Sequence, residues 1–200
     1  MAVCRIGGHR YELECSNLFI CTLDPSYMDV FVMEKAELIE KLKRLELQMK
    51  DPIPKNVKEK IESMLQQWGL EQKIFVETNA YKSILEIMKT DSVVIVIGSP
   101  GSGKSFTAQH MLLLLKKDGY NVIPVTTSSD MVKYFCKTSR QVFYIDNFCG
   151  KYNISSNDVE DWERNKETID EIFNCSLTKC IFTCRLHIYN DPLFKNLGLF

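Results

Sequence analysis

The pattern of apolar and polar positions divides the second half of the chain into short buried strands and intervening helices. Apolar runs at residues 93–97, 121–126, 141–148 and 179–184 have the length and the β-branched or aromatic character of buried strands. Residues 106–117, 130–137 and 158–174 between them carry apolar positions at helical spacing. Strands that alternate with helices favour a parallel sheet with right-handed crossovers, so we predict an α/β fold with helices flanking the sheet.

Helical spacing also predicts helices at residues 33–49, 56–68 and 79–89. The prolines at 52 and 54 separate the first two, and Gly69 is expected to end the second. These two helices form a hairpin, a coiled-coil arm or a docking surface, or else a cap packed on the next domain. Residues 1–32 show little pattern, apart from a candidate strand at 15–23. We therefore expect a poorly defined segment at 1–32, a helical extension at 33–70 and an α/β domain at 75–200.

A glycine-rich loop follows the apolar run at residues 93–97. Its sequence fits the phosphate-binding pattern G-x-x-x-x-G-K-[ST], and it has the strand before it and the helix after it that this P-loop motif requires. Backbone N–H groups at a helix N-terminus suit a polyphosphate, the lysine reaches the β- and γ-phosphates, and the serine binds Mg²⁺. A glycine-rich turn with a chance lysine is the less favoured alternative. We therefore expect a nucleotide to contact Gly98, Ser99, Pro100, Gly101, Ser102, Gly103, Lys104, Ser105 and Phe106.

Charged residues stand at the carboxyl ends of two later predicted strands. Asp146 follows an apolar run in the Walker B pattern, so we expect it to hold Mg²⁺ beside Ser105. Arg185 follows the run at 179–184 and faces the same crevice, where it contacts the γ-phosphate or forms an ordinary salt bridge. Ahead of the first sheet strand, Phe75 and Val76 are candidates for contacting the nucleotide base, although apolar residues more often serve the core.

Charge and cysteine usage narrow the class of protein further. The formal net charge is −1, which gives no electrostatic case for nucleic acid or an anionic membrane as a partner. No apolar run reaches the length of a membrane span, and no secretory signal is recognisable at the N-terminus. The eight cysteines show neither a C-x-x-C pair nor zinc-finger spacing, so we expect reduced thiols and a cytoplasmic location.

The stretch from residue 75 to residue 200 resembles the novel STAND NTPase 3 domain of the signal transduction ATPases with numerous domains. The matching pieces are FVETNAY, GSPGSGKS, DGYNVIPV, VFYIDNFCG and TCRLHIYNDPLF, and the preceding IPKNVKEKIESMLQQW resembles the helix before this domain. The resemblance implies a P-loop switch that binds ATP or ADP, or GTP, with Mg²⁺. It also implies homo-oligomers on activation and a role in signal transduction, often in innate immunity or regulated cell death. By resemblance Lys104 and Ser105 take the Walker A roles, Asp146 the Walker B role and Arg185 the sensor role.

Two departures from this pattern qualify the expectation. Switches of this class often have a second acid after the Walker B aspartate, but Asn147 stands there, and because an amide cannot accept a proton from water we expect slow or impaired hydrolysis. A core of this layout also needs a fifth strand, so we expect a truncated sheet or one completed by the N-terminus. The alternatives are a non-enzymatic scaffold whose N-terminal helices bind protein partners, and a small-molecule or nucleotide kinase, which would need a lid with clustered arginines.

Overall fold

The computed structural model describes residues 2–6, 9–13, 39–40 and 52–199, which fall into two compact units, Met1–Gln48 and Met49–Phe200. In the first unit, β1 (Ala2–Ile6) and β2 (His9–Leu13) pair antiparallel, with Cys4 opposite Tyr11. This hairpin occupies a segment for which we predicted no structure. The predicted strand at 15–23 lies outside the described residues, as does the predicted helix at 33–49 apart from residues 39–40.

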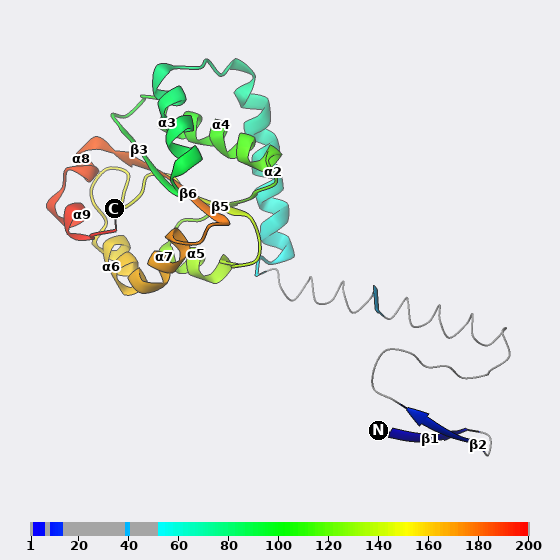
Figure 1. Ribbon diagram of the computed structural model, residues 1–200. Coiled ribbons are helices and arrows are strands. Elements are labelled where there is room, and N and C mark those ends of the chain that lie inside the picture. Colours follow the sequence, from blue (N-terminus) through cyan, green and yellow to red (C-terminus); the bar gives the residue numbers. More distant parts are fainter. Residues whose placement is uncertain (1, 7–8, 14–38, 41–51, 200) are drawn as a thin grey trace. The chain divides into compact units, whose positions relative to one another are not determined.

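The second unit contains a four-stranded parallel sheet (Figure 1). Its strands are β3 (Val93–Gly98), β4 (Asn121–Pro124), β5 (Gln141–Ile145) and β6 (Thr178–Arg185), in the spatial order β3-β6-β5-β4. All three pairings are parallel, so the predicted α/β fold is confirmed. β4 lies at an edge, as predicted from Pro124, which lacks an N–H for pairing.

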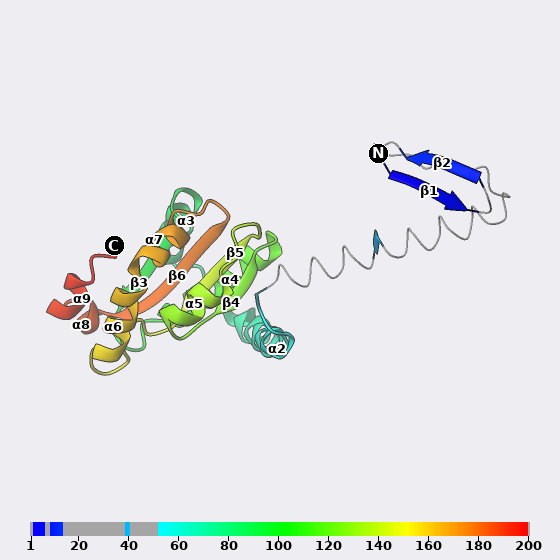
Figure 2. The ribbon, with the colours of Figure 1, turned by 90° about the horizontal axis from the view of Figure 1, so that it is seen from below.

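Helices cover both faces of the sheet, as Figures 1 and 2 show. One layer holds α2 (Lys55–Glu71), α3 (Asn79–Thr90) and α4 (Lys104–Lys117), with the 3-10 turn η1 (Gln72–Ile74) after α2. The other holds α5 (Ser128–Tyr134), α6 (Ser156–Arg164) and α7 (Lys166–Phe173), joined by α8 (Leu186–Tyr189) and α9 (Pro192–Asn196). None of the helices in the described part of the chain is long and apolar enough to cross a bilayer.

Alternate residues of each strand enter the two cores. On β6, Cys180 and Phe182 belong to the core beneath α5, α6 and α7, whereas Ile181 belongs to the core beneath α2, α3 and α4. Because both faces are buried, the strands appear in the sequence as continuous apolar runs rather than as an alternation. This burial on both faces is the reason that apolar runs in the sequence are sufficient to predict the strands.

The apolar stripe of α2 packs inside the second unit. Trp68 is 8% exposed and contacts Tyr144 of β5 in a T-shaped arrangement with ring centroids 5.8 Å apart. Glu62 of α2 forms a 2.7 Å salt bridge with Lys116 of α4. This segment is therefore a helical cap on the sheet. The prediction that Gly69 ends it is wrong, because the helix runs on through Gly69 to Glu71, and a 2.9 Å hydrogen bond from Gln67 to Glu71 spans the glycine.

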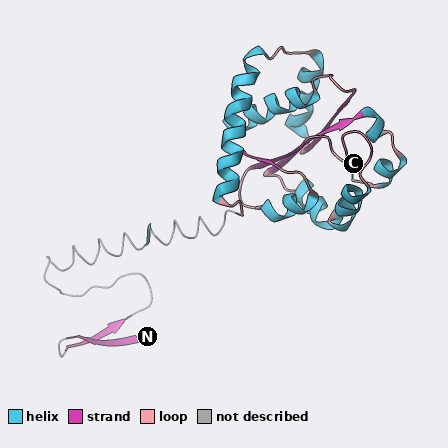
Figure 3. Ribbon diagram, turned by 180° about the vertical axis from the view of Figure 1, so that it is seen from behind, coloured by secondary structure: helices cyan, strands magenta, loops and turns pink. Residues whose placement is uncertain are grey.

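The single helix predicted at 158–174 is two helices. α6 and α7 meet at Asn165, whose ψ of 7° is outside the helical range. The side-chain amide of Asn165 donates to Ser128 Oγ at 2.9 Å and to the Asp161 carbonyl at 3.0 Å. Ser128 belongs to α5, which is distant from Asn165 in the sequence. The sequence pattern of α6 and α7 therefore gives no sign of the break. Figure 3 shows the resulting helical segments around the strands.

Candidate functional site

The glycine-rich loop between β3 and α4 adopts a conformation that only its glycines permit. Gly101 and Gly103 have φ angles of 77° and 79°, in the left-handed region that side chains disfavour. A Cβ on Gly98 would lie 2.7 Å from Ser102 Oγ. The loop therefore curls tightly on itself after the strand, and its backbone is open to approach by a ligand.

α4 begins directly at the end of this loop. Its first residue is Lys104 and its N-cap is Gly103, which supplies no side-chain cap. The first N–H groups of a helix have no partner within the helix, and the macrodipole places partial positive charge there. The Lys104 ammonium donates to the Ser99 carbonyl oxygen at 2.7 Å and therefore lies over the loop. This end of α4 is built to receive an anion.

Asp146 follows β5 and meets the loop across the sheet edge. The Ser105 hydroxyl donates to Asp146 Oδ1 at 2.6 Å, although the two residues are 41 positions apart in the sequence. The hydroxyl groups of Tyr144 and Thr183 donate to the same oxygen at 3.1 Å and 2.6 Å. The side-chain amide of Asn147 donates to Oδ2 at 2.8 Å. The carboxylate is thus held in one orientation by residues of β5, β6 and α4.

Burial changes the acidity of Tyr144, which bonds this carboxylate, and of Cys184 in the core next to Thr183. Burial, followed by the negative charge of Asp146, raises the pKa of Tyr144 well above its usual value, so the phenol remains a hydrogen-bond donor. Burial also raises the pKa of Cys184 to about 11, so its thiol stays neutral. Cys149, Cys175, Cys180 and Cys184 are free thiols.

The glycine-rich loop, the first turn of α4 and Asp146 surround a pocket of about 430 Å³ at the carboxyl ends of the strands. Of the predicted site residues, the structure brings eight to the pocket wall: Pro100, Gly101, Gly103, Lys104, Ser105, Phe106, Asp146 and Arg185. Arg185 reaches it from the end of β6. Gly98, Ser99 and Ser102 belong to the same loop but do not line the pocket.

Phe75 and Val76 lie away from the pocket wall. Phe75 stacks on the ring of His110 with centroids 3.8 Å apart, and it contacts Phe106, which does line the pocket, at 5.7 Å. The side chain of Val76 is 74% exposed. Contact between either residue and a nucleotide base therefore stays a prediction.

Sequence reasoning missed three residues of this site. Thr183 is fully buried in β6 and holds Asp146, but in the sequence it is one polar residue inside an apolar run. Tyr144 resembles an ordinary core aromatic. Lys151 lines the pocket from a loop whose sequence has no periodic pattern. Asn147 lines it too, but the sequence identified Asn147 only as the residue that replaces a second acid. A polar residue inside an otherwise apolar central strand was the available signal for Thr183.

The comparison with known proteins agrees with this geometry. No curated protein matches the chain. The family model described as Novel STAND NTPase 3 matches residues 75–196, which include the glycine-rich loop, Asp146 and Arg185. The match extends over more than half of the chain and covers every strand of the parallel sheet. The chain therefore belongs to the Novel STAND NTPase 3 family.

Proposed function

We propose that this protein binds a nucleotide, ATP or ADP, in the pocket at the carboxyl ends of the strands and acts as a signalling switch. The observation that carries the proposal is the 2.6 Å contact between Ser105 in the first turn of α4 and Asp146 after β5. That contact joins two distant parts of the sequence and supports a site in which they would hold phosphate and metal together. Lys104 and the open N-terminus of α4 supply the positive side.

The same contact supports a Mg²⁺ ion. Mg²⁺ prefers oxygen ligands, and the Ser105 hydroxyl and the Asp146 carboxylate are oxygen donors already in contact. These two residues would hold the ion, which when bound neutralises charge between the β- and γ-phosphates. Tyr144 and Thr183 keep the carboxylate oriented beside the Ser105 hydroxyl.

Base recognition would fall to the side of the pocket formed by Phe106. Phe75 lies against Phe106, and Val76 leaves an apolar side chain exposed beside it in the sequence. An apolar surface of this kind accepts a purine ring by stacking and contact. Family membership implies a nucleoside triphosphate without choosing its base, so ATP and ADP are tested first and a GTP competition experiment separates adenine from guanine.

Hydrolysis in this site would be slow. Asn147 occupies the place of a second acid, and its side-chain amide is engaged with Asp146 at 2.8 Å. An amide does not accept the proton of an attacking water, so none of the groups lining the pocket beside Asp146 is a ready general base. A switch that holds its nucleotide and turns it over rarely is the function that these residues support.

Protein partners would complete such a switch. The apolar stripe of α2 is used inside the domain, so a partner would contact the outer face of α2 or the helix predicted at 33–49. Homo-oligomers on activation, a cytoplasmic location and a role in innate immunity or cell death form part of the proposal and rest on the family. Size-exclusion chromatography with ADP and with a triphosphate analogue would detect the oligomer.

A Lys104→Ala variant tests nucleotide binding. We expect the parent protein to bind ADP with Mg²⁺ in isothermal titration calorimetry and to release nucleotide on denaturation, and we expect the variant to do neither. Lys82, which is exposed on α3 away from the pocket, provides the matched control Lys82→Ala. If Lys104→Ala binds ADP as well as the parent, the site assignment is wrong. An empty parent protein favours the scaffold, and phosphate transfer to an added acceptor favours a kinase.

A further inference from the structure

The loop at residues 149–155, between β5 and α6, brings one side chain to the pocket and a second against Arg185 of the pocket wall, and the proposed function uses neither. Lys151 lines the same pocket as Lys104 and Asp146. The next residue, Tyr152, is 71% exposed, and its ring centroid lies 5.1 Å from the guanidinium carbon of Arg185. The ammonium of Lys151 lies 5.6 Å from the same centroid. One aromatic ring therefore stands beside two cations at the mouth of the site.

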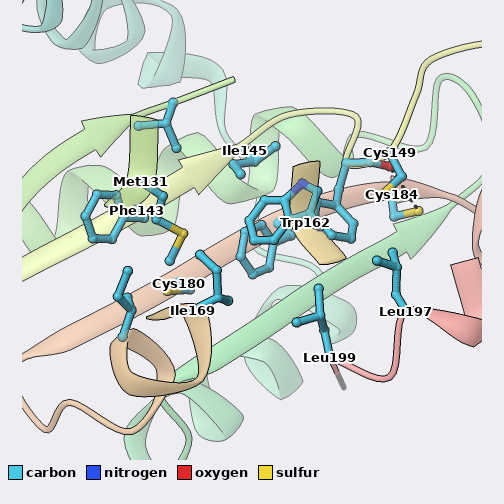
Figure 4. Packing of buried hydrophobic residues seen from close by; sticks show 14 of the residues in the cluster. Met131, Phe143, Ile145, Cys149, Trp162, Ile169, Cys180, Cys184, Leu197 and Leu199 are labelled. Atoms are coloured by element: carbon cyan, nitrogen blue, oxygen red, sulfur yellow. Dashed lines mark hydrogen bonds between the residues drawn. The ribbon is translucent and has the colours of Figure 1, made fainter. Parts of the chain in front are cut away.

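The start of this loop is anchored in the core. Phe148 is fully buried among Trp162, Phe182 and Phe194, and its N–H donates to the Thr183 carbonyl at 2.8 Å. Figure 4 shows Cys149 packed beside Cys184 at this point. The loop therefore leaves the sheet from a fixed position directly after Asp146.

Contacts within the loop fix its shape as well. The Ser155 N–H donates to the Cys149 carbonyl at 2.8 Å, which closes the loop. Gly150 has a φ of 133°, and a Cβ there would lie 2.1 Å from the Asn153 carbonyl oxygen. His187 donates through Nε2 to the Tyr152 carbonyl at 2.9 Å and ties the loop to the residues after β6. The backbone that carries Lys151 and Tyr152 is thus held on both sides.

The residues that line the pocket carry more positive than negative charge. Lys104, Lys151 and Arg185 are opposed by the single carboxylate of Asp146 among the lining residues. Like charges brought to one pocket repel one another, and a polyphosphate relieves that repulsion. A ligand with one more negative charge gains more from such a site, so the arrangement favours a triphosphate over a diphosphate.

We propose that Lys151 contacts the terminal phosphate of a bound nucleoside triphosphate and makes the site discriminate triphosphate from diphosphate, with Tyr152 positioning Arg185 beside it. This inference rests on the proposed nucleotide site. Lys104 lies over the glycine-rich loop, where it donates to the Ser99 carbonyl. Lys151 and Arg185 come from other elements, the loop after β5 and the end of β6, and line the pocket together with Asp146. A metal held by Asp146 would lie at the β- and γ-phosphates, so Lys151 and Arg185 would meet phosphate oxygens beyond those that Lys104 contacts.

Calorimetric titration of the full chain with Mg²⁺-ADP and with Mg²⁺-adenylyl imidodiphosphate, which resists hydrolysis, tests the inference. Lys151→Gln should weaken binding of the triphosphate analogue about threefold to fivefold and binding of ADP less than about twofold, as expected for one exposed charge. Lys151→Arg should restore the preference, and Lys82→Gln, an equal loss of charge on α3, should leave both affinities unchanged. The deficit of Lys151→Gln should shrink as NaCl rises from about 50 mM to about 500 mM, because salt screens exposed charges.

Variants at Tyr152 test the positioning role separately. Tyr152→Phe keeps the ring beside Arg185 and should bind both nucleotides as the parent does. Tyr152→Leu removes the ring and should weaken the triphosphate analogue about threefold, a size typical of an exposed cation–π contact. The inference is overturned if Lys151→Gln weakens both nucleotides equally or neither. If the parent protein binds ADP and Lys151→Gln keeps the full preference for the triphosphate, only this inference is overturned. If the parent protein binds neither nucleotide, the proposed function is overturned as well.

Discussion

Replacing Thr183 with valine should separate the hydrogen bonds of the site from its packing. Valine has nearly the volume of threonine but lacks the hydroxyl, and Thr183 is fully buried in β6. That hydroxyl donates to Asp146 Oδ1 at 2.6 Å and accepts from the Asn147 N–H at 2.9 Å. The substitution therefore leaves one donor and one acceptor without this partner while the core stays filled.

The size of the effect follows from these two bonds. A buried N–H that loses its acceptor costs about 1–3 kcal/mol, and a lost hydrogen bond to a charged group costs about 1.5–3 kcal/mol. Asp146 is exposed and keeps its bonds from Ser105 and Tyr144, so water recovers part of the second cost. We expect Thr183→Val to lower the free energy of unfolding by about 2–3 kcal/mol, or the melting temperature by about 5–10 °C for a domain of this size.

Urea unfolding followed by tryptophan fluorescence measures this change. The chain has two tryptophans, and Trp68 and Trp162 are both buried in the second unit, on opposite faces of the sheet, so the signal reports the unfolding of that unit. Thr183→Ser is the matched control, because it keeps the hydroxyl and loses one buried methyl group, at a cost of about 1 kcal/mol.

A double-mutant cycle with Asp146→Ala then isolates the contact, because alanine removes the oxygen that accepts the Thr183 hydrogen bond, whereas asparagine would keep an acceptor. We expect a coupling energy of about 1 kcal/mol or more between the two positions, because they share a hydrogen bond. The reasoning would be refuted by a Thr183→Val protein within about 0.5 kcal/mol of the parent, or by a Thr183→Ser protein that is as unstable as Thr183→Val.

Three further substitutions have defined outcomes. Gly150→Ala should lower the free energy of unfolding by more than about 2 kcal/mol, because the φ is strained for alanine and the new Cβ meets a carbonyl oxygen at 2.1 Å; calorimetry that shows an unchanged melting temperature would contradict this. Asp161→Asn should cost about 1 kcal/mol at pH 7, since Asp161 accepts hydrogen bonds at the first turn of α5. Burial raises the pKa of Asp161, but these hydrogen bonds lower it by more, so its pKa in the folded state is depressed. The stabilisation is therefore present above the unfolded-state pKa and is lost as pH falls through the folded-state pKa. Urea titrations should show the free energies of unfolding of Asp161→Asn and the parent converging over that range. Asn147→Asp should raise any hydrolysis, and because it places a second carboxylate beside Asp146, nucleotide binding should depend more steeply on Mg²⁺; unchanged turnover in a phosphate-release assay would show that the missing acid does not limit the rate.

The features that were predictable from the sequence are the ones that depend on neighbours along the chain. The strands were recognisable because both faces of a parallel sheet are buried, and the glycine-rich turn between β3 and α4 because its glycines serve a local backbone conformation. The break at Asn165 depends on Ser128, which is remote in the sequence, so periodicity alone could not reveal it. Gly69 was misjudged because packing of Trp68 and the rest of α2 on the sheet outweighs the low helix propensity of one glycine.

The residues of the candidate site divide in the same way, into those that belong to a local sequence motif and those whose role depends on distant parts of the chain. Lys104, Ser105 and Asp146 belong to local motifs with a known chemistry, whereas Thr183 acquires its role from an aspartate 37 positions away. Lys151 stands in a loop whose sequence has no periodicity, and the pocket is what relates it to the phosphate loop. Residues that act across strands therefore need the strand order, which the sequence pattern alone does not supply.

The position of β6 in the sheet constrains how the protein is made. β6 is the last strand in the sequence, but it lies between β3 and β5, with Val93 paired to Cys180 and Gln141 to Thr178. While the ribosome is still producing residues before β6, β3 cannot join the β4–β5 pair, and Asp146 lacks its bond from Thr183. Formation of the sheet must therefore wait until the nascent chain has released β6, and closing a loop of that length is slow. Until then both halves expose apolar strand surface, so the chain has reason to depend on chaperones during synthesis.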